Sequence, residues 1–362
     1  MILNGYVANG SMMLSVAEGK EKYHLEDGHF ELKQKADQEL IRAIETGEER
    51  NTSDFSAIPV NVYENFYRNE EEDYDRDGNS EGAIRVYEET ENINLACLME
   101  GSFPENEEEI AIDRMHADNV GIRVGDTINV SGQSYQVTGL ISYVNYSTLH
   151  EKSTDLMFDA LKFNVAMVTK EGFGRLSGSI HYAYAWKYKQ EPANEIEEKE
   201  QSDDFMQALL TQTVVRENEL QDYVPRYANP AINFATDDMG SDEAMGGVLL
   251  DILIVIIAFI FAVTISNTIA KESKMIGTLR ASGYTKGELV RHYLSMPVIV
   301  TLIAAVIGNL LGYTVFKNIV VSMYYNSYSL PVYKTIWNTD AFFKTTVIPV
   351  FLNLMKKCLF ME

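Results

Sequence analysis

A short acidic stretch, Glu70–Gly82, carries carboxylates at the spacing of a calcium-binding loop. Asp73, Asp75 and Asp77 stand at alternate positions, and Gly78 follows them. In calcium loops this Asp-x-Asp-x-Asp-Gly order supplies oxygen ligands from the first, third and fifth positions, and the glycine permits a sharp turn. The stretch is therefore a candidate site for a hard divalent cation.

The rest of this stretch departs from the calcium pattern. Asn79 and Glu81 extend the candidate ligand set, but Ile84 stands where a calcium loop places its bidentate glutamate, and no helices are expected on either side. Seven of the 13 residues are acidic and only Arg76 opposes them, which is typical of a solvated hairpin tip. We expect a solvated tip, with a weak calcium site as the alternative and no other cofactor in this chain.

Sequence motifs of catalysis are absent from the chain. It contains no Gly-x-x-x-x-Gly-Lys-Ser/Thr phosphate loop, no His-Glu-x-x-His and no Gly-x-Ser-x-Gly. Its six histidines are scattered, and they give little support to a catalytic site assembled from distant residues. We therefore expect that this chain is not an enzyme and that any ATP is bound by a partner.

Charge divides the chain into two parts. Residues 1–240 contain 46 acidic and 20 basic residues, whereas residues 241–362 contain 7 and 10. An acidic surface of this strength repels nucleic acid, so that class of partner is excluded. Cys97 and Cys358 lie in different parts and provide no disulfide framework, so residues 1–240 must fold around an apolar core.

Two apolar segments in the second part have the length of membrane spans. Val248–Ala270 has 23 residues with one acid, Asp251, and Pro297–Phe316 has 20 residues without charge. A helix of the first length rises about 34 Å, which exceeds the hydrocarbon thickness of about 30 Å. Lys271–Met296 between them is basic, so it is expected on the cytoplasmic side, with residues 1–240 outside.

The basic segment has the pattern of two short amphipathic helices joined at Gly283–Tyr284. Met275, Ile276 and Leu279 recur at helical spacing, and Thr285 with Glu288 has the spacing of a capping box. The segment reads Lys271, then Met-Ile-Gly-Thr-Leu-Arg-Ala-Ser-Gly-Tyr from position 275 and Glu-Leu-Val-Arg from position 288. This pattern resembles the FtsX-like (MacB-like) permeases of ABC transporters.

That resemblance implies that the segment docks on a separate cytoplasmic ATPase. The residues that it assigns to coupling are Lys274, Met275, Ile276, Gly277, Leu279, Arg280, Gly283, Tyr284 and Glu288. Family members usually carry an acid where Met275 stands, which removes one polar contact. A basic helix that rests on anionic membrane lipid is the alternative.

Gly101–Tyr143 provides a second resemblance. Glu109–Asp113, Thr127–Val130 and Tyr135–Ile141 alternate as strands, with glycine turns between them. The stretch resembles the extracytoplasmic core domain of MacB-like permeases through Pro104, Glu109, Gly121, Val124, Gly125, Asp126 and Gly139. An ordinary small β-subdomain is the alternative.

The expected fold is an extracytoplasmic α+β domain with a MacB-like core, residues 1–240, joined to an α-helical transmembrane domain, residues 241–362. The expected order in the second domain is helix 248–270, cytoplasmic coupling loop 271–296, helix 297–316, outer loop 317–341 and truncated helix 342–355. In the first domain we expect a helix over Phe30–Thr46, strands over Ile58–Tyr67 and Ala83–Glu89, and a linker over Glu191–Asp204.

The family places a first spanning helix before the outer domain. Met1–Lys20 has no basic start and no long apolar run, so it is predicted to be neither a signal peptide nor a span. We therefore expect a piece of a longer permease, without the first transmembrane helix and the C-terminal part.

Small residues recur at every fourth position in both spans, and such stripes allow close helix packing within a chain or between permeases in a homodimer or heterodimer. They are Ala258, Ala262, Ser266, Ala304, Gly308 and Gly312.

The expected function is that of the permease subunit of an ABC transporter, a multi-pass protein of a bacterial cell membrane. A partner ATPase would drive movement of the outer domain, for export, extraction or signalling. A membrane-anchored receptor or sensor without an ATPase is the alternative, and a surface hydrolase has no motif in its favour.

Overall fold

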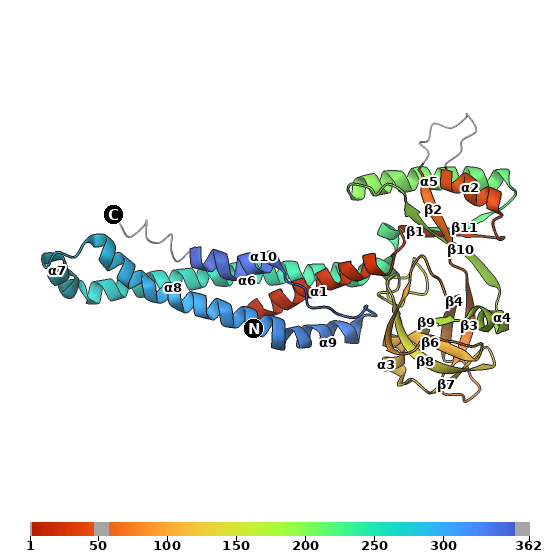
Figure 1. The fold of residues 1–362 in the computed structure, drawn as a ribbon, viewed down its shortest axis with the longest axis horizontal. Helices are drawn as coiled ribbons and strands as arrows, with labels where there is room; N and C mark the ends of the chain where they lie inside the picture. The colour runs from red at the N-terminus through yellow and green to blue at the C-terminus, as the bar shows by residue number, and fades with distance from the viewer. Residues whose placement is uncertain (1, 47–57, 352–362) are drawn as a thin grey trace. The chain divides into compact units, whose positions relative to one another are not determined.

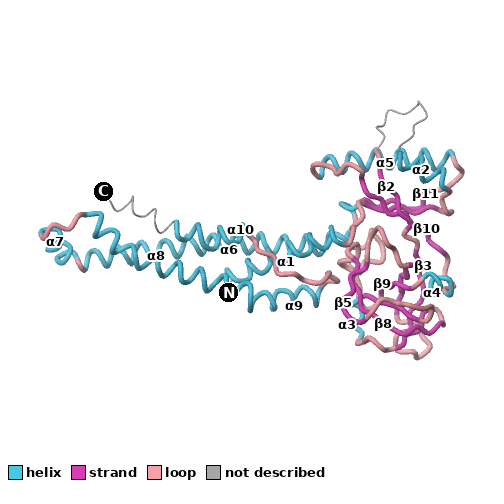
Figure 2. Tube along the Cα trace, in the orientation of Figure 1, coloured by secondary structure: helices cyan, strands magenta, loops and turns pink. Residues whose placement is uncertain are grey.

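The computed structural model describes residues 2–46 and 58–351 (Figure 1). The chain forms two compact units. The sheet unit comprises Val16–Asp237 and Tyr324–Val332, and the helical unit comprises Met1–Ser15, Asp238–Met323 and Tyr333–Glu362. All strands of the described chain belong to the sheet unit (Figure 2).

The elements of the sheet unit alternate between strands and short helices. The strands are β1 (Gly28–Leu32), β2 (Val60–Glu64), β3 (Tyr67–Asp73), β4 (Gly82–Glu88), β5 (Ala96–Gly101), β6 (Glu109–Asp113), β7 (Thr127–Val130), β8 (Gln133–Tyr143), β9 (Phe163–Val168), β10 (Ile180–Tyr188) and β11 (Leu220–Pro225). The helices are α2 (Gln38–Thr46), α3 (Arg114–Val120), α4 (Lys170–Arg175), α5 (Glu195–Val215) and the 3-10 helix η1 (Arg226–Ala228).

Strand β10 connects a small sheet to a large one. Its residues from Tyr182 onward pair with β1 and β2, and β1 pairs with β11, all antiparallel. Its first residues, Ile180 and His181, pair with β3. The large sheet continues in the order β3-β4-β9-β6-β8-β5, in which β4 with β9 and β6 with β8 are parallel, and β7 pairs with β3 and β8.

The small sheet buries one face against α2 and α5. Phe30 and Leu32 of β1 point into this core, while His29 and Glu31 between them are half-buried on the opposite face. The Phe30 ring stacks on Tyr184 of β10 at 5.4 Å between centroids. This alternation leaves the second face of the small sheet free to carry polar side chains.

The helical unit consists of long helices and their connections. Its elements are most of α1 (Ile2–Lys22) and α6 (Pro230–Lys271), then α7 (Ser273–Ala281), α8 (Lys286–Leu311), the π-helical turn η2 (Gly312–Phe316), most of α9 (Lys317–Ser327), α10 (Thr339–Phe342) and the π-helical turn η3 (Phe343–Val347). Segments predicted as separate are continuous: α8, η2 and α9 form one helical run, and the predicted outer loop 317–341 begins with α9. Residues 352–355 of the predicted helix 342–355 lie outside the described residues.

Several predicted strands are confirmed with their bounds. Glu109–Asp113 and Thr127–Val130 are β6 and β7, and Tyr135–Ile141 lies within β8. The helix predicted over Phe30–Thr46 is wrong in its first part, because Phe30 and Leu32 belong to β1. Helix α2 begins only after Asp37, whose Oδ1 accepts the Leu40 amide at 2.7 Å.

The predicted linker over Glu191–Asp204 is also wrong from Glu195 onward, where α5 begins. Asn194 caps this helix and accepts the amides of Ile196 and Glu197 at 3.0 and 3.1 Å. The acids of its first turn, Glu195 and Glu197 among them, are favourable beside the positive end of the helix dipole.

Candidate functional site

The predicted coupling segment folds as a helix, a tight turn and a second helix. Helix α7 ends in a Schellman motif, in which Tyr284 N–H donates to the Leu279 carbonyl at 3.1 Å and Gly283 N–H donates to the Arg280 carbonyl at 3.2 Å. Gly283 has φ +101°, in the left-handed region that residues with a Cβ rarely adopt. The predicted junction at Gly283–Tyr284 is confirmed.

The second helix begins with the predicted capping box. Thr285 Oγ1 accepts the Glu288 amide at 3.3 Å, and the Thr285 amide donates to Glu288 Oε2 at 2.8 Å. The helix was expected to be short. Instead α8 runs to Leu311 without a break at the predicted start of the span.

The base of this helix pair is fixed by a side-chain contact. The Tyr293 hydroxyl of α8 donates a hydrogen bond to a carboxylate oxygen of Glu272, the residue between α6 and α7. Leu289 is buried on α8. These contacts hold the start of α7 beside α8, so that α7 is a defined element and not a loose loop.

The predicted coupling residues are mostly exposed. Met275 and Tyr284 present large apolar side chains that are 59% and 51% exposed, whereas Ile276 and Leu279 are half-buried. The remaining predicted residues, all exposed, are Lys274, Gly277, Arg280, Gly283 and Glu288. A surface with apolar side chains among cations is suited to a protein partner or a lipid headgroup region.

Two helical runs have the length and composition of membrane spans. They are Pro230–Lys271 and Lys286–Ser327, and only 11% and 6% of their most apolar windows are buried in the protein. A core helix of a soluble protein would bury most of such a window. The apolar side chains of these runs therefore face outward, as they do in lipid.

Residues 247–352 match the family model of the FtsX-like permease C-terminal domain. The chain contains an FtsX-like permease domain. This match covers both apolar segments and the coupling segment between them, so the predicted family resemblance is confirmed there.

Two solved structures are similar to the chain. The periplasmic region of MacB from Actinobacillus actinomycetemcomitans is 8% identical in sequence, with a TM-score of 0.29. The alignment covers 57% of this chain and 93% of the MacB chain. The extracellular domain of the noncanonic ABC-type transporter YknZ from Gram-positive bacteria is 10% identical, covers 54% of this chain and 100% of its own, and has a TM-score of 0.28. No curated protein sequence matches the chain.

An additional helix packs on the FtsX-like domain. No helix is predicted in Met1–Lys20, yet α1 forms there, and Tyr6 and Val7 are buried with Leu250 of α6 and Ala341 of α10. Asn9 of α1 also donates to the Met239 carbonyl at 3.1 Å. The signal that the sequence offered was a row of small and apolar residues without charge before Glu18.

The predicted small-residue stripes lie at different depths in the helical unit. Gly308 and Gly312 are buried, Ala258 and Ala262 are half-buried, and Ser266 and Ala304 are exposed. Next to Gly308, the Asn309 amide donates to Thr346 Oγ1 of η3 at 3.0 Å. Both glycines are thus buried within the chain, and the role of all six small residues in helix packing stays a prediction.

The acidic tip connects β3 and β4, as a hairpin. Ligand oxygens of Asp73, Asp75, Asp77 and Glu81 lie within 4.8 Å of one another. Partial desolvation and the neighbouring carboxylates together raise the pKa of Glu81. The spacing in the sequence therefore does bring four acids together.

Inside the tip, the carboxylates also bind the backbone. Asp75 Oδ1 accepts the Asp77 amide at 3.0 Å, and Asp77 Oδ1 accepts the Asn79 amide at 2.8 Å. These bonds shape the turn without any cation. Calcium binding stays a prediction.

Proposed function

We propose that this chain is the permease subunit of an ABC transporter, and that a separate ATPase docks on α7 and its turn with α8. The match of residues 247–352 to FtsX-like permeases is the observation that carries this proposal. The exposed apolar side chains of Met275 and Tyr284, with Lys274 and Arg280 beside them in the sequence, supply the contact surface. ATP binds to the partner.

Helix α6 is suited to transmit movement away from the docking site. Its 42 residues rise about 63 Å, roughly twice the hydrocarbon thickness of a bilayer. Because its apolar part begins near Val248, the polar residues before it extend beyond the membrane as a rigid stalk. We infer that this stalk leads to the large domain on the outer face of the membrane.

A second connection is available through the segment after α9. Ser329 donates to the buried Asp113 carboxylate at 2.5 Å, and Arg114 donates to the carbonyls of Tyr325 and Tyr328 at 3.0 and 2.7 Å. These bonds anchor Tyr324–Val332 at the junction of β6 and α3. A shift of α8 would therefore pull on the large sheet as well as on α6.

Copurification of an ATPase tests this function. The full chain, tagged and expressed in its native membrane, should retain an ATPase after mild solubilisation. The Leu279→Asp variant should lose it, because an unpaired carboxylate buried in a protein interface costs several kcal/mol, on the order of 3 or more. Leu156→Asp is the matched control, since Leu156 is an exposed side chain of the sheet unit, 90% exposed.

The outcomes separate the candidate functions. Loss of the ATPase with Leu279→Asp and retention with Leu156→Asp supports docking on α7. An ATPase retained equally by both variants would exclude α7 as the docking element. A membrane-anchored receptor, the alternative function, predicts that no ATPase copurifies with the parent chain.

A further inference from the structure

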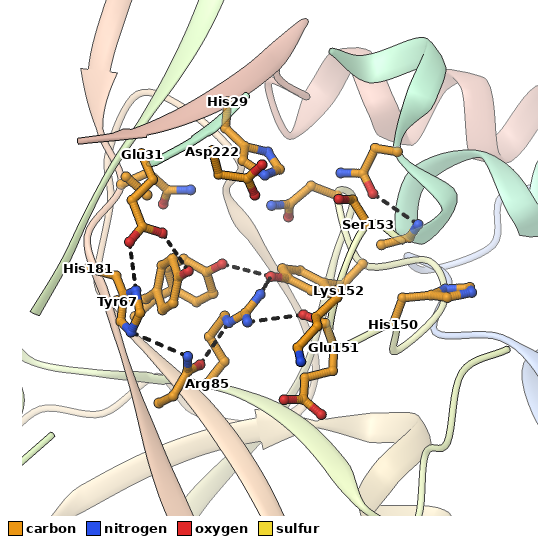
Figure 3. A pocket seen from close by; sticks show the side chains of 18 of the residues that line it. His29, Glu31, Tyr67, Arg85, His150, Glu151, Lys152, Ser153, His181 and Asp222 are labelled. Carbon is orange, nitrogen blue, oxygen red and sulfur yellow. Dashed lines mark hydrogen bonds and ion pairs between the residues drawn. The ribbon is translucent and has the colours of Figure 1, made fainter. Parts of the chain in front are cut away.

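A polar cavity of about 390 Å³ lies within the sheet unit. Its lining comes from the polar face of the small sheet, from β3 and β4 of the large sheet, and from the loop after β8 (Figure 3). His29 and Glu31 of β1 and Asp222 of β11 face it on one side, and Arg85 of β4 on the other. The volume is suited to a small molecule.

Arg85 and Lys152 are the arginine and lysine side chains that line this cavity, and no ion pair joins Arg85 to a carboxylate in the part of the chain that the structure describes. Its three nitrogens donate to neutral acceptors: Nε to Asn69 Oδ1 at 3.0 Å, Nη1 to the Tyr146 hydroxyl at 2.8 Å and Nη2 to the Glu151 carbonyl at 3.0 Å. The Tyr67 ring lies beneath the guanidinium at 4.4 Å.

Those contacts position the guanidinium for a ligand. Each Nη carries a second hydrogen, and none of the hydrogen bonds among the described residues uses that pair. Two such N–H groups form a fork that matches the two oxygens of a carboxylate. A half-buried arginine without a counter-ion is also electrostatically costly, and a bound anion would relieve that cost.

Hydrogen-bond acceptors also line the cavity. Glu31 is held by His181 Nδ1 at 2.8 Å and by the Tyr67 hydroxyl at 2.9 Å. Burial opposes the charge of Glu31, but these two bonds and the charges of His181 and Arg85 outweigh burial and lower the pKa of Glu31. Asp222 carries a second carboxylate. Asn145 is 6% exposed, and its Oδ1 is buried without a hydrogen-bond partner among the described residues. A ligand that donates hydrogen bonds would satisfy this oxygen.

We propose that the cavity binds a zwitterion, a free amino acid or a short peptide, with its carboxylate on Arg85 and its ammonium group towards Glu31 and Asp222. Net charge favours a zwitterion over the other charged classes. A polyanion would meet the acidic surface of residues 1–240, which hold 46 acids and 20 bases, and a simple cation would leave Arg85 without a counter-ion. The site is additional to ATPase docking, and its test does not require an ATPase.

Thermal unfolding of the purified full chain tests the proposal. The probes are a mixture of the free proteinogenic L-amino acids and, separately, a mixture of their dipeptides, each compound at millimolar concentration. Binding to the folded state should raise the apparent melting temperature. The amidated mixtures, which lack a free carboxylate, and the N-acetylated mixtures, which lack the ammonium group, should have no effect.

Substitutions locate the site. Arg85→Gln should weaken binding of the active mixture by at least about tenfold, because it removes a charge-assisted pair. Asp222→Asn should weaken it less and should fold normally, since the exposed Asp222 accepts the Tyr223 amide at 2.8 Å and asparagine retains that acceptor. Arg123→Gln is the matched control, an exposed arginine outside the cavity lining.

The two probe mixtures distinguish a free amino acid from a short peptide. The proposal fails if neither mixture shifts the melting temperature. It also fails if the amidated and acetylated mixtures act equally well, or if Asp222→Asn and Arg123→Gln bind as the parent does while Arg85→Gln is unfolded.

Discussion

Glu72 shows how a charged residue in an acidic run can serve the core. Glu72 belongs to Glu70–Asp73, which was predicted to be part of a solvated tip. Strand β3 extends through these residues instead, and the Glu72 side chain is 1% exposed. Asn164 donates to Glu72 Oε1 at 2.8 Å, and His116 Nε2 lies 3.3 Å from Glu72 Oε2. Composition cannot reveal such pairing, because the partners lie 44 and 92 residues away.

This pair predicts a pH dependence of stability. Burial opposes the charge of His116, but Glu72 and the Ala160 carbonyl outweigh it and raise the pKa of His116. A raised histidine pKa contributes stability that is fully present below about pH 6.5, the unfolded value, and is lost as the pH rises through the folded value. The apparent melting temperature of the full chain should therefore decrease as the pH rises from about 6.5 through the folded-state pKa of His116.

The Glu72→Gln variant tests the assignment. At pH 6 it should be less stable than the parent by roughly 3 kcal/mol, because the His116 charge loses its buried partner. The difference should shrink as the pH rises and His116 becomes neutral. Glu71→Gln is the control, since Glu71 is exposed on the same strand. A constant difference at every pH would show that Glu72 acts without the His116 charge.

The acidic tip leads to a second prediction at this scale. Asp75→Asn with Asp77→Asn keeps the oxygens that accept the Asp77 and Asn79 amides but removes two charges. In a solvated tip, repulsion falls, so the melting temperature without calcium should stay unchanged or rise slightly. Calorimetric titration of calcium into the full chain should give no saturable heat. Saturable millimolar binding that the double variant loses would replace the solvated tip with a calcium site.

At the scale of elements, patterns that depend on local chemistry were predictable. The alternation in Glu109–Asp113 and Thr127–Val130 gave both strands with their bounds, and Thr285 with Glu288 gave the start of α8. The failures depended on tertiary context. Leu32 fits a helical period with Ala36 and Leu40, but the antiparallel pairing of β1 with β10 and β11 assigns it to a strand.

Helix α1 was missed for a related reason. Its residues include Asn4, Asn9, Gly5 and Gly10, which weaken a hydropathy signal. Contacts with α6 and α10 supply what the local sequence lacks. The cavity around Arg85 could not be predicted either, because its residues come from strands far apart in the chain.

The turn between α7 and α8 predicts the effect of one substitution. Gly283→Ala places a Cβ at φ +101°, which costs about 1 kcal/mol and should speed amide hydrogen exchange in α7 about fivefold. Gly287→Ala is the matched control: Gly287 lies in the first turn of α8, and a Cβ there meets no atom within 4 Å. Equal exchange in both variants would show that the Schellman turn does not hold α7.

At the scale of the whole molecule, charge and apolar length together predict a topology. Residues 1–240 are strongly acidic, and the basic segment Lys271–Met296 lies between two apolar runs whose side chains face outward. Short basic loops remain in the cytoplasm, so Ser273 is expected inside and the sheet unit outside. The expected arrangement would put the predicted coupling residues where the proposed cytoplasmic ATPase can reach them.

Accessibility of single cysteines tests that topology. Cys97 and Cys358 are replaced, and a cysteine is placed at Gln133 of β8 or at Ser273 of α7, both exposed positions. In intact cells a membrane-impermeant thiol reagent should label position 133 and not position 273, and both should react after the membrane is opened. Labelling of position 273 in intact cells, with position 133 protected, would invert the topology and place α7 beyond the reach of ATP.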